Sequence, residues 1–294
     1  MKLSILIPTY NYDPSRLVRQ LQEQLPEDAE IIVGDDSPPD NLGRAARRNR
    51  LAREAKGEWL LFIDADAEVR SNAFIQNYMR AVTNSSAKGE EEPSPITPPI
   101  EAKGEAPLVV CGGTGNLPEC PRPAARLRYD YEVNAEKRLT LEQRRAHPYA
   151  QFTTFNFLIR RDIFLSIGFD ETLKEYGHED TLFGLELEKR HIPIQHIDNK
   201  LTHLGIEDAD LYLRKTETAL QALAKMSTEQ KRGARVSALA EQLRQLHLLG
   251  LVRVLFKVGR PLLRANLLGK HPSQHLFAIY KLGFYVNSLQ TSHA

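Results

Sequence analysis

The first part of the chain alternates short apolar runs with segments of helical periodicity, and this alternation restricts the fold more than any other feature. The apolar runs Leu3–Ile7, Glu30–Gly34 and Trp59–Ile63 have the length of buried β-strands. Between them, Ser15–Leu25 and Asn41–Lys56 place apolar residues three and four positions apart, as amphipathic helices do. A strand–helix–strand–helix–strand order predicts an α/β fold with a doubly wound, mostly parallel sheet flanked by helices.

Residues 84–107 interrupt this pattern, because they hold five prolines, five acidic residues and few apolar side chains. Such a segment buries too little surface to offset the entropy of ordering it, so we expect a flexible surface insertion. Further strands and helices follow it, and from Asp208 onward the pattern is typical of helices alone. We therefore expect an α/β domain over residues 1–205 and a C-terminal helical region over residues 206–294.

The composition excludes several classes of protein. The net charge is +1 over 294 residues, so no overall field favours nucleic acid as a partner. The chain has no apolar stretch of about 20 residues, as a transmembrane helix requires, and its first apolar run is too short for the core of a signal peptide. Cys111 and Cys120 are too few for a disulfide framework, and we expect reduced thiols in a cytoplasmic protein.

Acidic pairs follow two of the predicted strands. Asp35 and Asp36 end the second strand, and Asp64 and Asp66 end the third, on either side of the small Ala65. An acidic strand end is also typical of a turn, and for Asp35 and Asp36 considered alone a turn is the better explanation. The carboxyl ends of parallel strands nevertheless meet at one edge, where this architecture binds ligands. Mg²⁺ and Mn²⁺ bind carboxylate oxygens together with substrate phosphates, so Asp64 and Asp66 are candidate metal ligands.

Four motifs carry a resemblance to a known family: "SILIPTYN", "VGDDSPPD", "GRAARRNRLAREAKGEWLLFIDAD" and "FLIRRDIFLSIGFDETLKEYGHEDTLFGLEL…THLG". With these motifs in this order, residues 1–205 resemble the family 2 glycosyltransferases, which have a GT-A fold. The resemblance implies inverting transfer of a hexosyl or N-acetylhexosaminyl group from a nucleotide sugar, with UDP as the nucleotide. It implies a glycan or lipid-linked hydroxyl acceptor in polysaccharide biosynthesis, and Mn²⁺ or Mg²⁺ as cofactor at the DXD motif. The sequence lacks the QxxRW segment of processive synthases, so we expect a non-processive enzyme.

The resemblance assigns nucleotide-binding roles near the ends of the first two strands. It implies that Pro8, Thr9 and Tyr10 flank the base and the ribose of the donor. Asp36, or its neighbour Asp35, is implied to accept a hydrogen bond from the base, as family members do with uracil.

Other motif positions are implied to bind the diphosphate and the metal. Asn49 would hold its loop, while Arg48 or a nearby arginine would reach the diphosphate. Asp64 would contact the ribose or a metal-bound water, and Asp66 would bind the metal directly. His203, in "LTHLG", matches a histidine that completes the metal or diphosphate site in some relatives, and a surface or core role is an equal alternative.

The acceptor side is expected around His178, Glu179 and Asp180, at the predicted start of a helix. In an inverting transfer a carboxylate takes the proton of the attacking hydroxyl. The resemblance implies that Asp180 is this base, that Glu179 binds or orients the acceptor, and that His178 lies beside the sugars. Without the resemblance, the helix dipole would explain these acids. Thr154 or Asn156, in "FTTFNF", is implied to contact the donor sugar.

Two other functions fit parts of the sequence. A sugar-nucleotide nucleotidyltransferase also combines a doubly wound sheet with acidic metal ligands. That class needs a glycine-rich basic loop after its first strand, which "IPTYNYDPS" does not provide. A non-catalytic GT-A scaffold acting through its helical tail would not need Asp66 and Asp180 together. A glycosyltransferase is therefore the favoured prediction.

The C-terminal helices combine apolar residues with Arg253, Lys257, Arg260 and Arg264, and Pro261 is expected to break or kink the helix that carries them. This pattern fits two interpretations. The helices pack on the catalytic domain or form a homodimer, which we favour, or they lie at a membrane interface and attract anionic lipids. We accordingly expect a cytoplasmic protein, or one bound peripherally at the inner face of the cell membrane.

Overall fold

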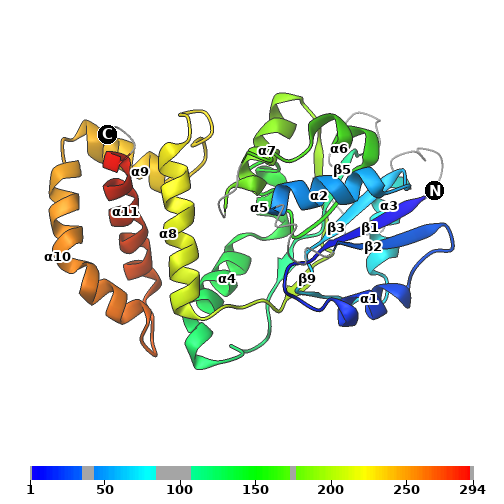
Figure 1. Ribbon diagram of the computed structural model, residues 1–294, viewed down its shortest axis with the longest axis horizontal. Coiled ribbons are helices and arrows are strands. Elements are labelled where there is room, and N and C mark those ends of the chain that lie inside the picture. The colour runs from blue at the N-terminus through cyan, green and yellow to red at the C-terminus, as the bar shows by residue number, and fades with distance from the viewer. Residues whose placement is uncertain (1, 35–42, 84–106, 173–176, 292–294) are drawn as a thin grey trace.

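The computed structural model describes residues 2–34, 43–83, 107–172 and 177–291. An α/β body forms one end of the molecule, and four C-terminal helices form the other (Figure 1). The predicted insertion at 84–107 lies outside the described residues apart from Pro107, and so do Asp35 and Asp36.

The main sheet has six strands in the order β2-β1-β3-β7-β5-β8 among the described residues. Five of them run in the same direction, while β7 is antiparallel to its neighbours β3 and β5. The predicted mostly parallel sheet is therefore confirmed. The strands are β1 (Leu3–Pro8), β2 (Ala29–Gly34), β3 (Trp59–Ile63), β5 (Val109–Cys111), β7 (Asn156–Arg160) and β8 (Ile194–His196).

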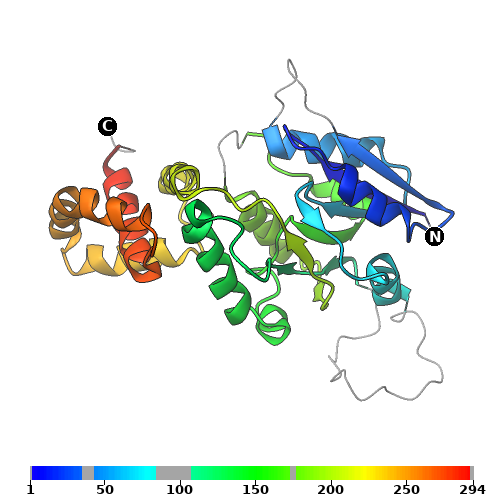
Figure 2. The same cartoon turned by 90° about the horizontal axis from the view of Figure 1, so that it is seen from below.

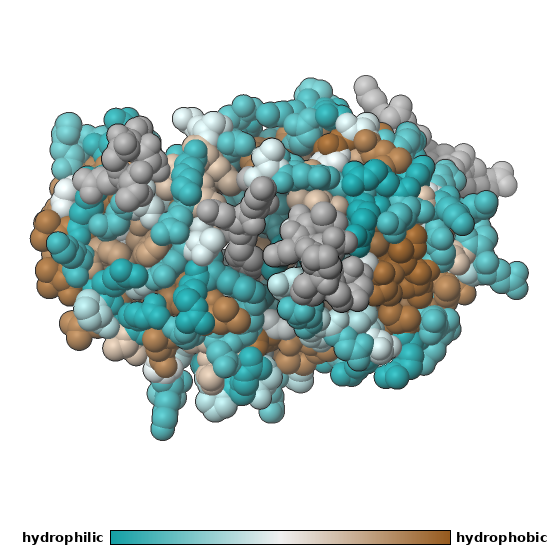
Figure 3. Space-filling view, in the orientation of Figure 1, coloured by the Kyte–Doolittle hydropathy of each residue, from teal (hydrophilic) through white to brown (hydrophobic). Residues whose placement is uncertain are grey.

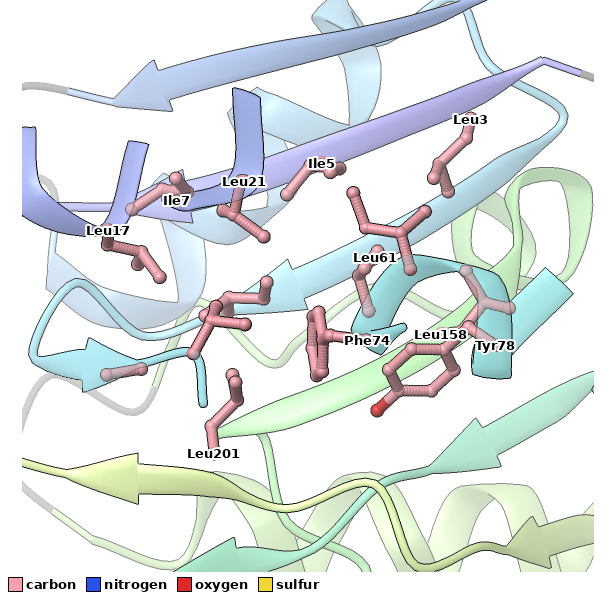
Figure 4. Close-up of a cluster of buried hydrophobic side chains, with 14 of the residues drawn as sticks. Leu3, Ile5, Ile7, Leu17, Leu21, Leu61, Phe74, Tyr78, Leu158 and Leu201 are labelled. Carbon is pink, nitrogen blue, oxygen red and sulfur yellow. The ribbon is translucent and has the colours of Figure 1, made fainter. Parts of the chain in front are cut away.

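Helices cover both faces of this sheet because successive strand residues point to opposite sides. Ile5 and Ile7 of β1 face α1 and α3, whereas Leu6, between them, faces the opposite layer. Figure 4 shows the buried cluster on the side of α1 and α3, in which Leu21 and Phe74 pack on the strands. The first layer consists of α1 (Ser15–Gln22) and α3 (Phe74–Thr83), and the second of α2 (Gly43–Glu54), α6 (Arg161–Ile167) and α7 (Glu179–Lys189).

A second, three-stranded sheet connects the end of β3 to a distant part of the chain. Its strands are β4 (Ala67–Glu68), β9 (Leu201–His203) and β6 (Thr114–Gly115), with β9 in the middle. Ala67 lies opposite His203 in this sheet. The pairing therefore carries His203 to the segment that holds Asp64 and Asp66.

The C-terminal helices pack on the α/β body through α4. Leu127 of α4 shares a buried cluster with Leu213 of α8 and with Phe277 and Tyr280 of α11. Both cartoon views show α4 beside α8, with α10 and α11 beyond them (Figures 1 and 2). The C-terminal helices are α8 (Ala209–Lys225), α9 (Arg235–Gln245), α10 (Leu249–Leu267) and α11 (Gln274–Thr291). On the α/β body, a 3₁₀ turn at Pro123–Ala125 leads into α4 (Arg126–Arg138), which is followed by α5 (Leu141–Ala146).

The sequence predicted a break or a kink at Pro261. The structure shows no break, because α10 continues through Pro261 to Leu267. A proline leaves the carbonyl four residues earlier, here that of Lys257, without its helical partner. Lys257 and its neighbour Val258 are exposed, so water can reach that carbonyl. No helix among the described residues has both the length and the apolar character needed to cross a bilayer.

Candidate active-site cleft

A cleft of about 720 Å³ lies at the carboxyl ends of β1 and β3. It is lined by the end of β1, the start of α2, the turn after β3, the start of α7 and the segment after β9. The predicted site residues that line it are Pro8, Tyr10, Arg48, Asp64, Asp66 and Glu179. The structure therefore brings together residues that are far apart in the sequence.

Asp64 leaves β3 in a tight turn and pairs with a buried arginine. The turn is closed by the amide of Ala67, which donates to the Asp64 carbonyl at 3.1 Å. Arg48 Nη2 donates to Asp64 Oδ1 at 2.6 Å. Burial alone would lower the pKa of Arg48, but the carboxylates of Asp64, Asp180 and Glu179 raise it overall. Arg48 is therefore a fixed cation, and its Nε has no hydrogen-bond partner among the described residues.

Asp66 belongs to a chain of three side chains with His203 at its centre. His203 Nε2 lies 3.2 Å from Asp66 Oδ2, and its Nδ1 lies 2.8 Å from Glu132 Oε2. Burial would lower the pKa of His203, but hydrogen bonds and charges from the two carboxylates raise it to about 9. Burial would raise the pKa of Asp66, and His203 lowers it overall. A Cβ at Gly205 would stand 1.9 Å from Asp66 Oδ2, so only glycine fits beside this carboxylate.

These side chains fit a divalent metal that substrate oxygens would complete. Among the described residues, no group of three or more ligand-type side chains is assembled to hold an ion. The 3.2 Å between Asp66 Oδ2 and His203 Nε2 is nevertheless roughly the spacing of adjacent ligands around an octahedral ion with bonds of about 2.1 Å. Glu132 orients the imidazole through its second nitrogen, as carboxylates do for metal-binding histidines. Two protein ligands with free positions for phosphate and water suit Mg²⁺ or Mn²⁺.

Asp180 lies behind the cleft wall, at the start of α7. Thr154 Oγ1 donates to Asp180 Oδ1 at 2.8 Å. Burial raises the pKa of Asp180 to about 6; repulsion from Glu179 adds to this effect, and Arg48 and Thr154 oppose it. A carboxyl that titrates near neutral pH is suited to general-base catalysis. Glu179 itself lines the cleft and lies 3.6 Å from Arg44 Nη1.

Four other predicted residues have structural contacts instead of lining the cleft. Asn156 is fully buried. Its amide nitrogen donates to the carbonyls of Gly113 and Asn199, and its amide oxygen accepts from the hydroxyl of Tyr78. The Thr9 hydroxyl donates to a carbonyl of β2, and the Asn49 side chain forms two hydrogen bonds with the backbone of Phe169, in the segment after α6. His178 has a left-handed backbone, with φ of 74°, and its Nε2 lies 2.9 Å from the carbonyl of Ala219 in α8. Neither Asn156 nor His178 is thus among the residues that line the cleft.

Cations line the cleft beyond those that the motifs indicated. Arg44 and Arg47 accompany Arg48 on one face of α2, because residues three and four apart lie on the same side of a helix. The "RAARR" spacing carried this signal in the sequence. Arg122 and Lys215 add charges from after β6 and from α8. Glu132, in contrast, has no motif, and only the packing of α4 reveals its contact with His203.

Comparison with known proteins gives one family match. The model of the glycosyl transferase family 2 matches residues 38–87, a segment that contains α2, β3 and the Asp64–Asp66 motif. No curated protein matches the chain. The family match therefore covers two of the segments that line the cleft, α2 and the turn after β3.

Solved structures match nearly the whole chain at low identity. A mannosyltransferase, PcManGT from Pyrobaculum calidifontis in complex with GDP-Man and Mn²⁺, has a TM-score of 0.52 and 15% identity, over 98% of this chain and 86% of that one. TarS 1-349 from S. aureus has a TM-score of 0.47 and 17% identity, over 100% of this chain and 91% of that one. Glucosyl-3-phosphoglycerate synthase from Mycobacterium tuberculosis has a TM-score of 0.47 and 13% identity, over 78% of this chain and 79% of that one. At such identities only the fold is shown, and of these three structures the mannosyltransferase supports it. The family match over residues 38–87 and the shared GT-A fold both agree with the resemblance to the family 2 glycosyltransferases that the motifs carry.

Proposed function

We propose that the protein transfers a sugar from a nucleoside diphosphate donor, with UDP as the nucleotide, to a hydroxyl of a glycan or lipid-linked acceptor. The observation that carries this proposal is the mixture of charges in one cleft. Arg44, Arg47 and Arg48 line the same space of about 720 Å³ as Asp66. A diphosphate needs the arginines, and a metal that accompanies it needs the carboxylate. The mannosyltransferase with the same fold was solved with GDP-Man and Mn²⁺, which supports a nucleotide sugar as the donor class.

The donor nucleotide would enter beside β1. Tyr10 is half exposed at the end of this strand, and its ring lies 5.3 Å from the guanidinium carbon of Arg47. This places a flat apolar surface next to a cation, which suits a base and ribose followed by a diphosphate. Asp35 or Asp36 would select the base by accepting its hydrogen bond, and this assignment rests on the sequence motif alone.

The metal would be held by Asp66 and His203, with Asp64 nearby. His203 must release its proton to become a ligand, because only a neutral imidazole nitrogen binds a metal. When bound, the ion would supply Lewis-acid neutralisation of the departing diphosphate. The arginines of α2 would stabilise the same developing charge by fixed hydrogen bonds.

The reaction would be a single in-line displacement. Asp180 takes the proton of the acceptor hydroxyl while that oxygen forms a bond to the anomeric carbon. The bond from the anomeric carbon to the diphosphate oxygen breaks, and the nucleoside diphosphate leaves with the electron pair. The configuration at the anomeric carbon is thereby inverted. Glu179, on the cleft wall next to Asp180, would orient the acceptor.

The test is product release from a panel of UDP-sugars and GDP-sugars, with Mn²⁺, with Mg²⁺ and with a chelator. We expect nucleoside diphosphate release that needs the metal and falls about 10²- to 10⁴-fold in Asp180→Asn, since that is the usual contribution of a general base. The rate of nucleoside diphosphate release should fall by a comparable factor in Asp66→Ala. Asp162→Asn, an exposed carboxylate paired with Arg160, is the matched control and should leave the rate unchanged.

Three outcomes would contradict the proposal. Unchanged rates in both Asp66→Ala and Asp180→Asn would remove these residues from the reaction. Absence of activity with every nucleotide sugar, despite a folded protein, would favour a non-catalytic scaffold. Release of pyrophosphate during synthesis of a nucleotide sugar would identify a nucleotidyltransferase, because glycosyl transfer releases only the nucleoside diphosphate.

A further inference from the structure

One face of α10 is apolar and open to solvent. Its side chains recur at spacings of three and four residues, which places them along one side of the helix. Between 55% and 78% of each side chain is exposed. The space-filling view shows hydrophobic residues at the edge of the molecule where α10 lies (Figures 1 and 3). We call this set the α10 stripe: Leu251, Val254, Leu255, Val258 and Leu262.

The opposite face of α10 already packs inside the protein, so the stripe is not needed for folding. Phe256 and Leu267 are buried against α11 and α8. Scattered apolar residues on a surface need no explanation, but a continuous row of them marks an interaction site. The stripe therefore requires a partner with an apolar surface.

The charge of the surrounding chain indicates what kind of partner this is. Residues 242–294 contain seven lysines and arginines and no acidic residue, whereas residues 1–241 contain 32 lysines and arginines and 38 acidic residues. Three of the seven cations, Arg244, Arg260 and Arg264, pair with acidic residues outside the segment, and the other four leave it positive on a body that is negative. A second copy would bring one positive segment against another, which is unfavourable. An anionic surface is the complementary partner.

The structure shows which basic residues of α10 make contacts inside the molecule. Arg253 lies near a backbone carbonyl of α11, at 3.4 Å. Arg260 and Arg264 form ion pairs with acidic residues of α8. These three therefore hold α10 in place. Lys257 is exposed and has no ion pair among the described residues, and Lys270 is exposed in the turn after α10.

We propose that the α10 stripe docks the protein on an anionic phospholipid membrane. The aliphatic side chains enter the interface between headgroups and acyl chains, and Lys257 and Lys270 meet the phosphate groups. No residue of the stripe lines the active-site cleft, so docking leaves the cleft open to donor and acceptor. The proposal does not depend on the identity of either substrate.

The test is flotation of the full chain with two kinds of vesicle, one of phosphatidylcholine alone and one of phosphatidylcholine and phosphatidylglycerol in equal parts. We expect binding to the anionic vesicles that weakens as salt is added. The double variant Val258→Gln, Leu262→Gln should bind about 100-fold more weakly, because each aliphatic side chain that leaves water contributes roughly a factor of ten. Lys257→Gln should bind about fivefold more weakly at low salt.

The matched control is Leu165→Gln on α6, which replaces an exposed leucine on the catalytic body and should bind like the unmodified protein. Thermal unfolding and transfer to a soluble acceptor should be unchanged in all the variants, so loss of docking and loss of catalysis are distinguishable. The proposal is overturned if the unmodified chain does not float with anionic vesicles, or if the double variant floats equally well. It is also overturned if the protein is a dimer in solution that the double variant converts to a monomer, since the occupant is then a second copy.

Discussion

Asp66 lines the cleft and Asp180 lies behind its wall, and the surroundings of these two aspartates shift their pKa values in opposite directions. Asp66 is bonded to the His203 ring, which Glu132 also contacts, and its pKa is lowered. Asp180 is buried next to another acid, Glu179, and both effects raise its pKa, to about 6, against the hydrogen bond from the Thr154 hydroxyl. The first stays ionised and suits a cation, while the second can accept and release a proton. Neighbouring groups, not residue identity, therefore divide the two roles.

The pH dependence of transfer is the most direct way to break this comparison. Because Asp180 acts as a base only when ionised, we expect kcat/KM to rise about tenfold per pH unit up to about 6 and then to level off. The rate at about pH 4 should thus be about 100-fold below the plateau. The measurement is initial nucleoside diphosphate release at saturating metal, with circular dichroism at each pH to verify folding. A profile that stays flat across this range in folded protein would remove Asp180 as the base.

Glu132 tests the other half of the comparison. Glu132→Gln removes the carboxylate that orients His203, and we expect the apparent affinity for Mn²⁺ to fall about 10- to 100-fold. Titration of the rate with Mn²⁺ measures this, and direct Mn²⁺ binding measured by electron spin resonance checks it without activity. Glu136→Gln is the matched control, because Glu136 lies one turn later on α4 and pairs with Lys200. Equal losses in the two variants would show that the effect is only the stability of α4.

Replacing Asp180 and replacing Asp66 by asparagine should change the free energy of unfolding in opposite directions. The folded-state pKa of Asp180 lies above its ordinary value of 3.8, so the folded state binds the extra proton between pH 3.8 and about 6. The free energy of unfolding therefore falls as pH rises through that window, and the ionised carboxylate costs stability above it. At about pH 7.5, Asp180→Asn should raise the free energy of unfolding by about 1–3 kcal/mol.

Asp66→Asn should have the opposite effect, a loss of about 1 kcal/mol, because the buried His203 ring loses one of its two carboxylate partners. Urea unfolding of both variants beside the unmodified protein provides the comparison. The same sign in both would mean that the surroundings of the two carboxylates do not differ in the way described.

Much of the donor side could be predicted from the sequence, since it depends on local pattern. The apolar runs predict β1 and β3, and the parallel arrangement then brings the strand ends with Pro8 and Asp64 to one edge. The arginines of α2 follow from helical spacing in the same way. Tertiary packing determines the rest: Glu132 reaches His203 across 71 positions of sequence, and no periodicity encodes that contact.

The acceptor side and the C-terminal region show the same limit. His178 belongs to a motif, yet its left-handed backbone leads the ring toward α8 instead of the cleft. The pattern of α10 shows an amphipathic helix, but it does not show which basic residues are used inside the molecule. The ion pairs with acidic residues of α8 show that Arg260 and Arg264 are used inside the molecule. Side chains whose partners come from distant elements are therefore the ones that sequence reasoning misplaces.

Thr154 offers the finest test of why Asp180 and Asp66 differ. Its hydroxyl bond favours the ionised carboxylate and so opposes the effects of burial and of Glu179 on the pKa of Asp180, as the charge of Arg48 also does. Thr154→Val keeps the shape of a side chain that is 4% exposed and removes only this bond. A net hydrogen bond of about 1 kcal/mol corresponds to somewhat less than one pH unit.

The midpoint of the kcat/KM profile should thus move upward by about that amount, so that the variant is a few-fold slower near pH 6 and equal to the unmodified enzyme near pH 8. Thr154→Ser keeps the hydroxyl and should retain the original midpoint. A loss of rate that is the same at every pH would assign Thr154 to the architecture of the cleft wall. The difference between the two aspartates would then have to come from burial and from the neighbouring charges alone.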